Sequence, residues 1–339
     1  CENAVAAGRH VVTANKALLA IHGRELAIAA EAANVALGYE SSVAGGIPVI
    51  KSLREGFAGN RISSVHGILN GTCNYILTTM RETGRDFDDV LAEAQELGYA
   101  EADPTFDVDG IDAAHKLALL ASVAFGTEVD FDSVHVEGIR HISAEDIAFA
   151  DELGFRIKLL GIANQTSDGI EQRVYPCMVP MDAPLAHVEG VFNAVVAEGD
   201  AVGTSVLQGR GAGAGPTASA VISDIADIAR GVVLPVFSVP ASQLSKANTV
   251  SIENRVGPYY VRLTVLDRPG VIADVAACLR DQEVSVESLL QHGRKPDEAV
   301  PVVLTTHMAE EKALANALAA MDELGAVLET PRMIRIVNL

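Results

Sequence analysis

The sequence contains no tryptophan, and aromatic residues of all kinds make up only 4% of its 339 residues. Its four cysteines stand far apart and match no metal-binding spacing, so we interpret them as reduced thiols. No apolar run approaches the length of a membrane span, and the first residues lack a charged segment followed by an apolar one. These absences predict a cytoplasmic protein that has no membrane partner.

Basic residues are also scarce. The chain has 25 lysines and arginines against 45 aspartates and glutamates, which gives a net charge of −20. Such a charge argues against nucleic acid as a partner, because the phosphate backbone attracts basic surfaces. Apolar residues make up 49% of the chain, so material for hydrophobic cores is ample. At this length we expect two or three domains.

A G-x-G-x-x-G turn, the usual mark of a dinucleotide-binding domain, is missing as well. The chain nevertheless begins with alternating helix and strand patterns, with short apolar strands at 10–14 and 34–39, which indicates a parallel sheet. Lys16 would follow the first strand, on the side where such sheets bind ligands, although a solvated lysine at a helix start is an equally good reading. We therefore interpret residues 1–38 as the remainder of a Rossmann-type nucleotide-binding domain whose front part is missing.

Residues 39–204 have a different pattern of helices and strands, which predicts an α+β domain. A glycine-rich turn at 39–48 enters a helix, and it either binds an ion or merely connects two elements. An apolar strand then leads to Asn70-Gly71-Thr72-Cys73-Asn74 at the start of another helix. Amides and hydroxyls at such a start can bind a carboxylate or a polarised oxygen, but a plain N-cap explains them better on local evidence.

Acidic residues cluster between Gly98 and Lys116, where a carboxylate-rich loop leads into an apolar helix. Asp112 falls in the first turn of that helix and Lys116 four residues later, so the two share a helix face. A solvated ion pair would explain this pattern without any function. A calcium loop does not fit, because its twelfth position would be Lys116 and not glutamate. The third reading is an enzyme site, in which acids hold a substrate ammonium and the lysine stays near a reacting oxygen.

The last third of the chain contains a glycine-rich loop and a separate domain. The glycines at 209–217 precede a helix, where they would allow the close approach of a phosphate or make a simple tight connection. Residues 236–256 read as a linker. The tail, residues 257–339, has the order βαββαβ, which predicts a ferredoxin-like domain. It lacks a basic face and an aromatic ladder, which argues against RNA binding.

Together these motifs resemble the homoserine dehydrogenases that carry a C-terminal ACT regulatory domain, over essentially the whole sequence. The most specific signs are Thr13-Ala14-Asn15-Lys16, Tyr39-Glu40 with 43–48, Asn70 to Tyr75, Gly98 to Pro104 and Asp112-x-x-x-Lys116. The resemblance implies an α/β fold with three domains. Residues 1–38 and 205–235 would form a partial Rossmann-type nucleotide domain, and residues 39–204 an α+β domain for catalysis, substrate binding and oligomerisation (dimerisation). Residues 257–339 would form a ferredoxin-like ACT domain. It also implies the interconversion of L-aspartate 4-semialdehyde and L-homoserine with NADP or NAD, in threonine, methionine and isoleucine biosynthesis.

The resemblance further implies roles for single residues. Lys116 would donate and accept the proton, and Lys16 would lie between the nicotinamide and the substrate, so that both amino groups meet at one aldehyde oxygen. The implied binding residues are Glu101 on the substrate ammonium, Asp112, Asp107 and Thr72 around the substrate, and Gly213 on the cofactor. Hydride addition to the aldehyde carbon leaves an alkoxide, which two ammonium groups could stabilise.

Two further sites follow from the resemblance. Backbone carbonyls of Glu40, Val43, Gly45 and Ile47 would bind Na⁺ or a similar monovalent cation with a structural role. Asp267, Gly270 and Val271 would receive threonine as a feedback effector between paired ACT domains, so we expect a homodimer or a homotetramer. Because the dinucleotide fingerprint is missing, the alternative is a non-catalytic amino-acid sensor or interaction protein.

Overall fold

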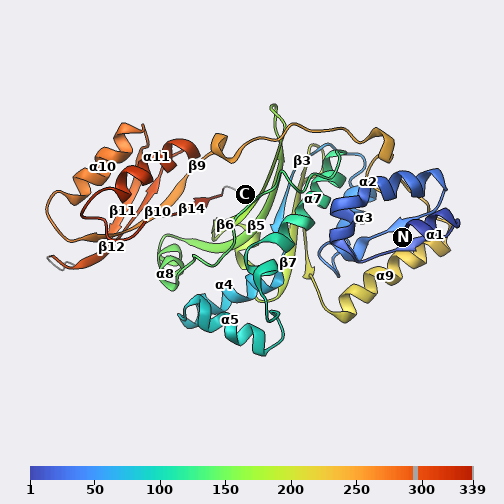
Figure 1. Cartoon of the computed structure of the whole chain (residues 1–339), viewed down its shortest axis with the longest axis horizontal. Helices are drawn as coiled ribbons and strands as arrows, with labels where there is room; N and C mark the ends of the chain where they lie inside the picture. Colours follow the sequence, from blue (N-terminus) through green and yellow to red (C-terminus); the bar gives the residue numbers. More distant parts are fainter. Residues whose placement is uncertain (293–296, 338–339) are drawn as a thin grey trace. The chain divides into compact units, whose positions relative to one another are not determined.

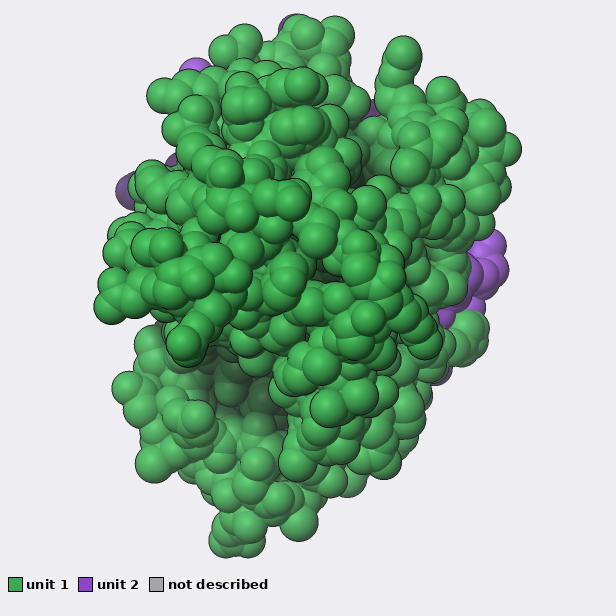
Figure 2. Space-filling view, turned by 90° about the vertical axis from the view of Figure 1, so that its right-hand side faces the viewer, with its two compact units in different colours: residues 1–144, 158–175, 187–250 green, residues 145–157, 176–186, 251–339 purple. Residues whose placement is uncertain are grey.

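The computed structural model describes residues 1–292 and 297–337 of the chain. Two compact units make up the fold, and Figure 2 colours them green and purple. Unit 1 contains residues 1–144, 158–175 and 187–250, and unit 2 contains residues 145–157, 176–186 and 251–339. The range predicted for the ACT domain, 257–339, therefore lies within unit 2, together with two segments from the middle of the chain.

Unit 1 begins with a small α/β layer (Figure 1). Helix α1 (Glu2–Ala6) precedes β1 (Val11–Val12), and α2 (Lys16–Ala32) connects β1 to its parallel partner β2 (Leu37–Gly38). Asn15 caps α2, because its side-chain oxygen accepts a hydrogen bond from the Leu18 amide at 3.0 Å. Helix α9 (Ala214–Ala229) contacts both strands from a distant part of the chain. The predicted parallel pairing is confirmed.

The second layer of unit 1 is a sheet with mainly antiparallel pairing. Strand β3 (Ile62–Ile68) lies between β5 (Phe155–Gln165) and β7 (Phe192–Gly199), and β8 (Gly203–Arg210) pairs with β7. Strand β6 (Ile170–Pro180) neighbours β5, and the short β4 (His135–Val136) pairs with β6 in parallel. The strands predicted at 156–162, 171–175 and 191–197 are confirmed, whereas the sequence pattern did not predict β8.

Unit 1 also contains α3 (Val49–Lys51), which continues into a π-helical turn (Ser52–Gly56), α4 (Gly71–Thr83), α5 (Phe87–Glu96), α6 (Thr105–Val108) and α7 (Ile111–Phe125). Helix α7 packs against both β3 and α2, which explains why its sequence is apolar on nearly all sides. Gly110 before it and Gly126 after it take the left-handed conformation that delimits the helix. The surface of unit 1 is hollowed on the face seen in Figure 2.

Unit 2 contains the predicted βαββαβ order (Figure 1). Its elements are β10 (Tyr259–Leu266), α10 (Val271–Asp281), β11 (Val286–Gln291), β12 (Ala299–Thr306), α11 (Glu311–Asp322) and β14 (Arg332–Ile336). Strand β12 lies antiparallel between β10 and β11, and β14 lies on the other side of β10. The short strands β9 (Val256–Gly257) and β13 (Ala309–Glu310) pair with each other. The ferredoxin-like prediction is confirmed.

Both faces of the unit 2 sheet are used. Alternate residues of β10, such as Tyr259 and Val261, are buried in one core with residues of α10 and α11. Tyr260 and Arg262 project from the opposite face and bind Asp146 of α8 (Ala144–Glu152). The Tyr260 hydroxyl donates to Asp146 at 3.0 Å and the Arg262 Nε atom donates at 2.7 Å. This buried carboxylate ties α8 to the sheet.

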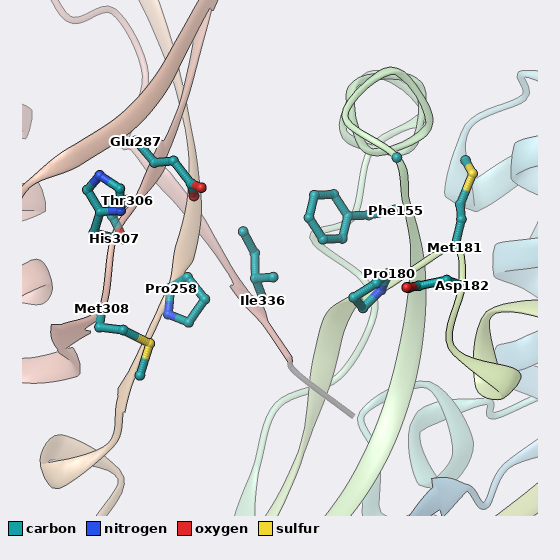
Figure 3. A pocket seen from close by; sticks show the side chains of 11 residues that line it. Phe155, Pro180, Met181, Asp182, Pro258, Glu287, Thr306, His307, Met308 and Ile336 are labelled. Atoms are coloured by element: carbon teal, nitrogen blue, oxygen red, sulfur yellow. The ribbon is translucent and has the colours of Figure 1, made fainter.

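Unit 2 also contains a cavity of about 590 Å³, shown in Figure 3. Its lining includes Phe155, Glu287, His307 and Met308, and none of the described residues that we predicted for catalysis, cofactor or effector binding. The cavity therefore does not identify the reaction site. Within residues 1–292 and 297–337, no helix combines the length and the apolar character that crossing a membrane requires.

Candidate active site

Asp112 is the centre of a buried charged cluster in unit 1. It lies in the first turn of α7 and is 4% exposed. Its Oδ1 atom is 2.8 Å from the Lys16 Nζ atom, and its Oδ2 atom is 2.6 Å from the Lys116 Nζ atom. Asn70 adds a third contact, since its Nδ2 atom donates to Oδ2 at 2.8 Å. One carboxylate thus joins two lysines that are far apart in the sequence.

The two lysines reach Asp112 from different elements. Lys16 is the first residue of α2, shortly after β1 ends, and its side chain is 30% exposed. An ammonium at a helix N-terminus opposes the helix dipole, and the charge of Asp112 compensates for it. Lys116 lies one turn after Asp112, and its Nζ atom also donates to the Leu69 carbonyl at 2.8 Å. The structure therefore brings together the two amino groups that we predicted to share a substrate oxygen.

The two carboxylates of the cluster differ in acidity. Burial alone would raise the pKa of Asp112, but the ammonium groups of Lys116 and Lys16 outweigh this effect and lower its pKa to about 2. Burial raises the pKa of Asp107, and the negative charge of Asp112 adds to the rise, while a hydrogen bond from Asn70 opposes it. Asp112 is consequently anionic throughout the physiological range.

The start of α4 connects the two carboxylates. Asn70 is its N-cap, and the Asn70 Nδ2 atom donates to Asp107 Oδ1 at 2.7 Å as well as to Asp112. The Thr72 hydroxyl donates to the Tyr99 carbonyl at 2.7 Å and lies 3.4 Å from Asp107 Oδ2. Asn70 was not predicted as a site residue, because the N-cap reading explained it. Its place between a buried strand and the start of a helix, where a side-chain amide can bind a carboxylate, is the signal that could have identified it.

Two predicted residues lie outside this network. Glu101 is exposed, and its backbone carbonyl accepts a hydrogen bond from Gln95 Nε2 at 2.9 Å. Among the described residues, no hydrogen bond or ion pair joins the Glu101 carboxylate to the Asp112 cluster. Gly213 directly precedes α9 with φ +109°, and no side chain of the described residues caps that helix.

The turn predicted to bind a cation is buried. The Glu40 carboxylate accepts hydrogen bonds from the amides of Ile50 and Lys51 at 2.9 and 2.8 Å, and burial raises its pKa to about 7. Gly45 has φ +36°, and a Cβ atom there would collide with the Gly211 carbonyl, so the turn requires glycine at this point. Val43 and Ile47 are buried in the same turn.

The predicted effector residues lie in unit 2, at the junction of β10 and α10. Asp267 follows the strand, and its amide donates to the Glu298 carbonyl at 2.9 Å. Gly270, with φ +101°, is the N-cap of α10, and Val271 is its buried first residue. The three residues thus surround one tight turn.

The Asp112 cluster and the βαββαβ domain define an α/β enzyme with a lysine–aspartate site and a C-terminal regulatory-type domain. Family models agree: one described as homoserine dehydrogenase matches residues 48–226, and one described as ACT domain matches residues 259–326. The homoserine dehydrogenase of Pseudomonas aeruginosa is 47% identical over 343 residues, which cover 99% of this chain and 79% of that protein. The homoserine dehydrogenase of Neisseria gonorrhoeae is 46% identical over 342 residues, with the same shares covered.

Solved structures of homoserine dehydrogenases also match this chain. A homoserine dehydrogenase from Thiobacillus denitrificans matches with a TM-score of 0.93 and 46% identity, covering 99% of this chain and 78% of that chain. A hyperthermophilic archaeal homoserine dehydrogenase in complex with NADPH matches with a TM-score of 0.61 and 33% identity, covering 69% and 68%. The chain belongs to the homoserine dehydrogenase family. The expectation of an NAD(P)-dependent oxidoreductase of amino-acid biosynthesis is confirmed, and the alternative of a non-catalytic sensor is not favoured.

Proposed function

We propose that the Asp112 cluster is the place where L-aspartate 4-semialdehyde and L-homoserine are interconverted, with Lys116 as the proton donor and acceptor. The observation that carries this proposal is the contact of Lys16 and Lys116 with the two oxygens of one buried carboxylate. A substrate oxygen placed between the two Nζ atoms receives positive charge from both. Such a position stabilises the alkoxide that forms when the aldehyde is reduced.

Both lysines keep hydrogen-bond capacity for a substrate. An ammonium group has three N–H donors. Among the described residues, Lys116 uses two donors, on Asp112 and on the Leu69 carbonyl, and Lys16 uses one, on Asp112. At least one donor of each lysine is therefore left for the reacting oxygen, which supports a shared role at that atom.

The substrate is an amino acid, so its ammonium group requires a carboxylate. We assign this contact to Glu101, whose exposed carboxylate is open to a ligand. Asp112 would hold both lysines in place beside the substrate. Asp107 and Thr72, whose side chains lie 3.4 Å apart, would form the adjoining wall. These contacts would orient the substrate for reaction.

The residues around α9 fit a nicotinamide cofactor. Within the part of the chain that the structure describes, no side chain caps this helix and a Cβ atom on Gly215 would meet nothing within 4 Å. The backbone at the helix start is therefore open to a ligand. Gly213 and Lys16 would contact the cofactor, which is NADP or NAD. When bound, the reduced cofactor supplies the hydride to the aldehyde carbon. The NADPH in the archaeal relative supports this part of the proposal.

The turn at 39–48 fits a monovalent cation such as Na⁺ with a structural role. In the described structure the buried carbonyls of Val43 and Gly45 accept no hydrogen bond, whereas that of Ile47 accepts one from the Val49 amide at 2.7 Å. Such oxygens, with the Glu40 carbonyl, are suitable ligands for a hard cation. A rise in melting temperature on adding NaCl to a low-salt buffer, with no rise from choline chloride, would support this assignment.

Regulation and setting complete the proposal. The ACT domain suggests an amino-acid effector, and we propose threonine, bound near Asp267, Gly270 and Val271. Pairing of ACT domains would make the protein a homodimer or a homotetramer. We place it in the cytoplasm, in the biosynthesis of threonine, methionine and isoleucine.

The substitution Lys116→Met tests the catalytic assignment, because it keeps the apolar stem and removes the ammonium. We expect kcat of the complete enzyme to fall below a few per cent, since both proton transfer and charge stabilisation are lost. The control is Lys158→Met, which removes another buried lysine of unit 1, one that donates to the Val188 carbonyl at 2.6 Å. This control should reduce stability and leave most of kcat. A Lys116→Met enzyme with substantial turnover would contradict the proposal.

A further inference from the structure

An aromatic column stands beside the lysine–aspartate cluster of unit 1. The His115 ring of α7 stacks on the Phe131 ring, with centroids 4.1 Å apart and planes 12° apart. It also contacts the Phe106 ring of α6, with centroids 5.6 Å apart. His115 is 7% exposed and Phe106 is 41% exposed. The column is thus anchored inside unit 1 and ends on an exposed ring.

The exposed end of the column contacts Lys16. The Lys16 Nζ atom lies 5.5 Å from the centroid of the Phe106 ring, which is a cation–π distance. In the described structure, Asp112 is the other partner of this ammonium. Lys16 is the first residue of its helix and is 30% exposed on its side chain, so the helix leaves the long side chain room to move. A ring on one side of the ammonium and a carboxylate on the other leave it fewer positions than open solvent would.

Helix α6 is only one turn long, yet two of its residues contact residues of the Asp112 cluster. Phe106 contacts Lys16, and the next residue, Asp107, accepts a hydrogen bond from Asn70 at 2.7 Å. Successive residues of a helix project in different directions. The placement of this one turn therefore sets both the ring under Lys16 and the carboxylate next to Asp112.

We propose that Phe106 is a positioning residue for the reaction: its ring, supported by His115 and Phe131, holds the Lys16 ammonium against Asp112. No sequence motif indicated this residue. The inference deepens the proposed function, because it rests on the assignment of Lys16 to the reacting oxygen. The predicted consequence is a slower chemical step, rather than weaker substrate binding, when the ring is removed.

The chemistry of His115 agrees with a supporting role. Burial lowers the pKa of His115, so its imidazole is neutral at neutral pH. Its Nδ1 atom is buried and makes no hydrogen bond to the described residues. A neutral ring can stack on Phe131 and pack against the tilted Phe106 ring without adding a third positive charge beside Lys16 and Lys116. The column is therefore held by ring packing.

The first test compares Phe106→Leu with Phe106→Tyr in the complete enzyme. Leucine keeps apolar volume but has no π face, whereas tyrosine keeps the face. The free energy of an exposed cation–π contact corresponds to a factor of about two to five in a rate constant. We therefore expect kcat of Phe106→Leu to fall by about that factor. The Michaelis constant for the aldehyde should change less than about two-fold. Phe106→Tyr should restore kcat. Phe192→Leu is the matched control, since it removes an exposed ring that lies 6.0 Å from the Arg210 guanidinium carbon.

A second readout is independent of turnover. Reductive methylation with ¹³C-formaldehyde labels the amino groups of the seven lysines, and the variant Lys16→Arg identifies the Lys16 signal by its loss. A ring face 5.5 Å away moves that signal upfield. The upfield shift should disappear in Phe106→Leu, remain in Phe106→Tyr and be unaffected in Phe192→Leu.

The outcomes separate this inference from the proposed function. If Phe106→Leu leaves kcat unchanged, the inference fails, whether or not the Lys16 signal moves. The inference also fails if the Michaelis constant of Phe106→Leu rises by the same factor as kcat falls and Phe106→Tyr does not restore kcat. Full turnover in Lys16→Met would instead refute the role of Lys16 in the proposed function, and the methyl signal would still report whether the ring contacts the ammonium.

Discussion

Replacing Asp112 by asparagine would remove one negative charge from between two ammonium groups and keep the shape of the side chain. In the wild type the carboxylate is 4% exposed and contacts Lys16 and Lys116 at 2.8 and 2.6 Å. In the variant, Lys116 keeps the Leu69 carbonyl but loses its counter-charge. A charge left without a partner in a buried site is destabilising, so we expect the Asp112→Asn protein to unfold more easily at neutral pH.

The pKa of Asp112 gives the magnitude of this effect. A decrease from an ordinary 3.8 to about 2 corresponds to roughly 2 to 3 kcal/mol of stability at pH 7. Lys16 is 30% exposed and can turn toward water in the variant, which favours the lower end of that range. The Asp112 carboxylate binds its proton more readily in the unfolded chain than in the folded protein. This stability is therefore present above about pH 4 and is lost as the pH falls through about 2. Roughly half of it should remain at pH 3.

Urea unfolding of wild type and Asp112→Asn at pH 7, 4 and 3 measures this contribution. The control is Asp109→Asn in the same segment, because the Asp109 carboxylate is 37% exposed and pairs with Arg140 at the surface. Such surface pairs contribute about 0 to 1 kcal/mol, so the control should unfold nearly like the wild type. The reasoning is refuted if Asp112→Asn loses no more than the control at pH 7. It is equally refuted if the loss is as large at pH 3 as at pH 7.

Three further outcomes are expected. Glu101→Ala should raise the Michaelis constant of the amino-acid substrate and change kcat little, because it removes the carboxylate assigned to the substrate ammonium; an unchanged constant in steady-state kinetics would contradict this. Gly270→Ala puts a side chain at φ +101° in the effector turn, and it should raise the threonine concentration for half-inhibition by about five-fold or more. Burial lowers the pKa of His66 on β3 from 6.5 to about 4, so protonation of the unfolded chain should reduce stability by roughly 2 kcal/mol between pH 7 and pH 5. Urea unfolding of His66→Leu should not show that decrease.

Periodicity located the elements of unit 2 well. The strand predicted at 259–266 and the helix predicted at 271–281 have the bounds of β10 and α10. Alternating apolar residues define that strand, and the Asp-Arg-Pro-Gly turn after it fixes where the helix begins. The last strand was predicted at 326–337 and is shorter, 332–336, because Val327 makes only an isolated bridge to Val265.

Strand β8 could not be predicted from the local sequence pattern. Its residues, 203–210, are exposed or half-buried on both sides, so no apolar face marks the segment in the sequence. Its pairing with β7 along eight residue pairs makes it a strand. Tertiary context overrides local preference in such edge strands, and a single sequence does not reveal that context.

The charged residues of the Asp112 cluster were predicted, whereas the contacts that join them to the uncharged residues around them were not. The spacing of Asp112 and Lys116 is local and can be derived from helix geometry. Lys16 comes from another helix, and the resemblance, not its position, predicted that it joins them. Asn70 and Phe106 were not predicted, because an N-cap and an exposed ring have ordinary structural explanations. Their contacts to the cluster depend on how α2, α4, α6 and α7 pack.

The opposite pKa shifts of the two carboxylates restrict which group can move the proton. Asp112 has a pKa of about 2, so it carries no proton to give at neutral pH. Asp107 has a raised pKa, but Asn70 and Thr72 already contact both of its oxygens. Lys116 is hydrogen-bonded to Asp112 on α7 and has one N–H donor left. These contacts support the proposal that the Lys116 ammonium, which Asp112 holds in place, supplies the proton for the alkoxide.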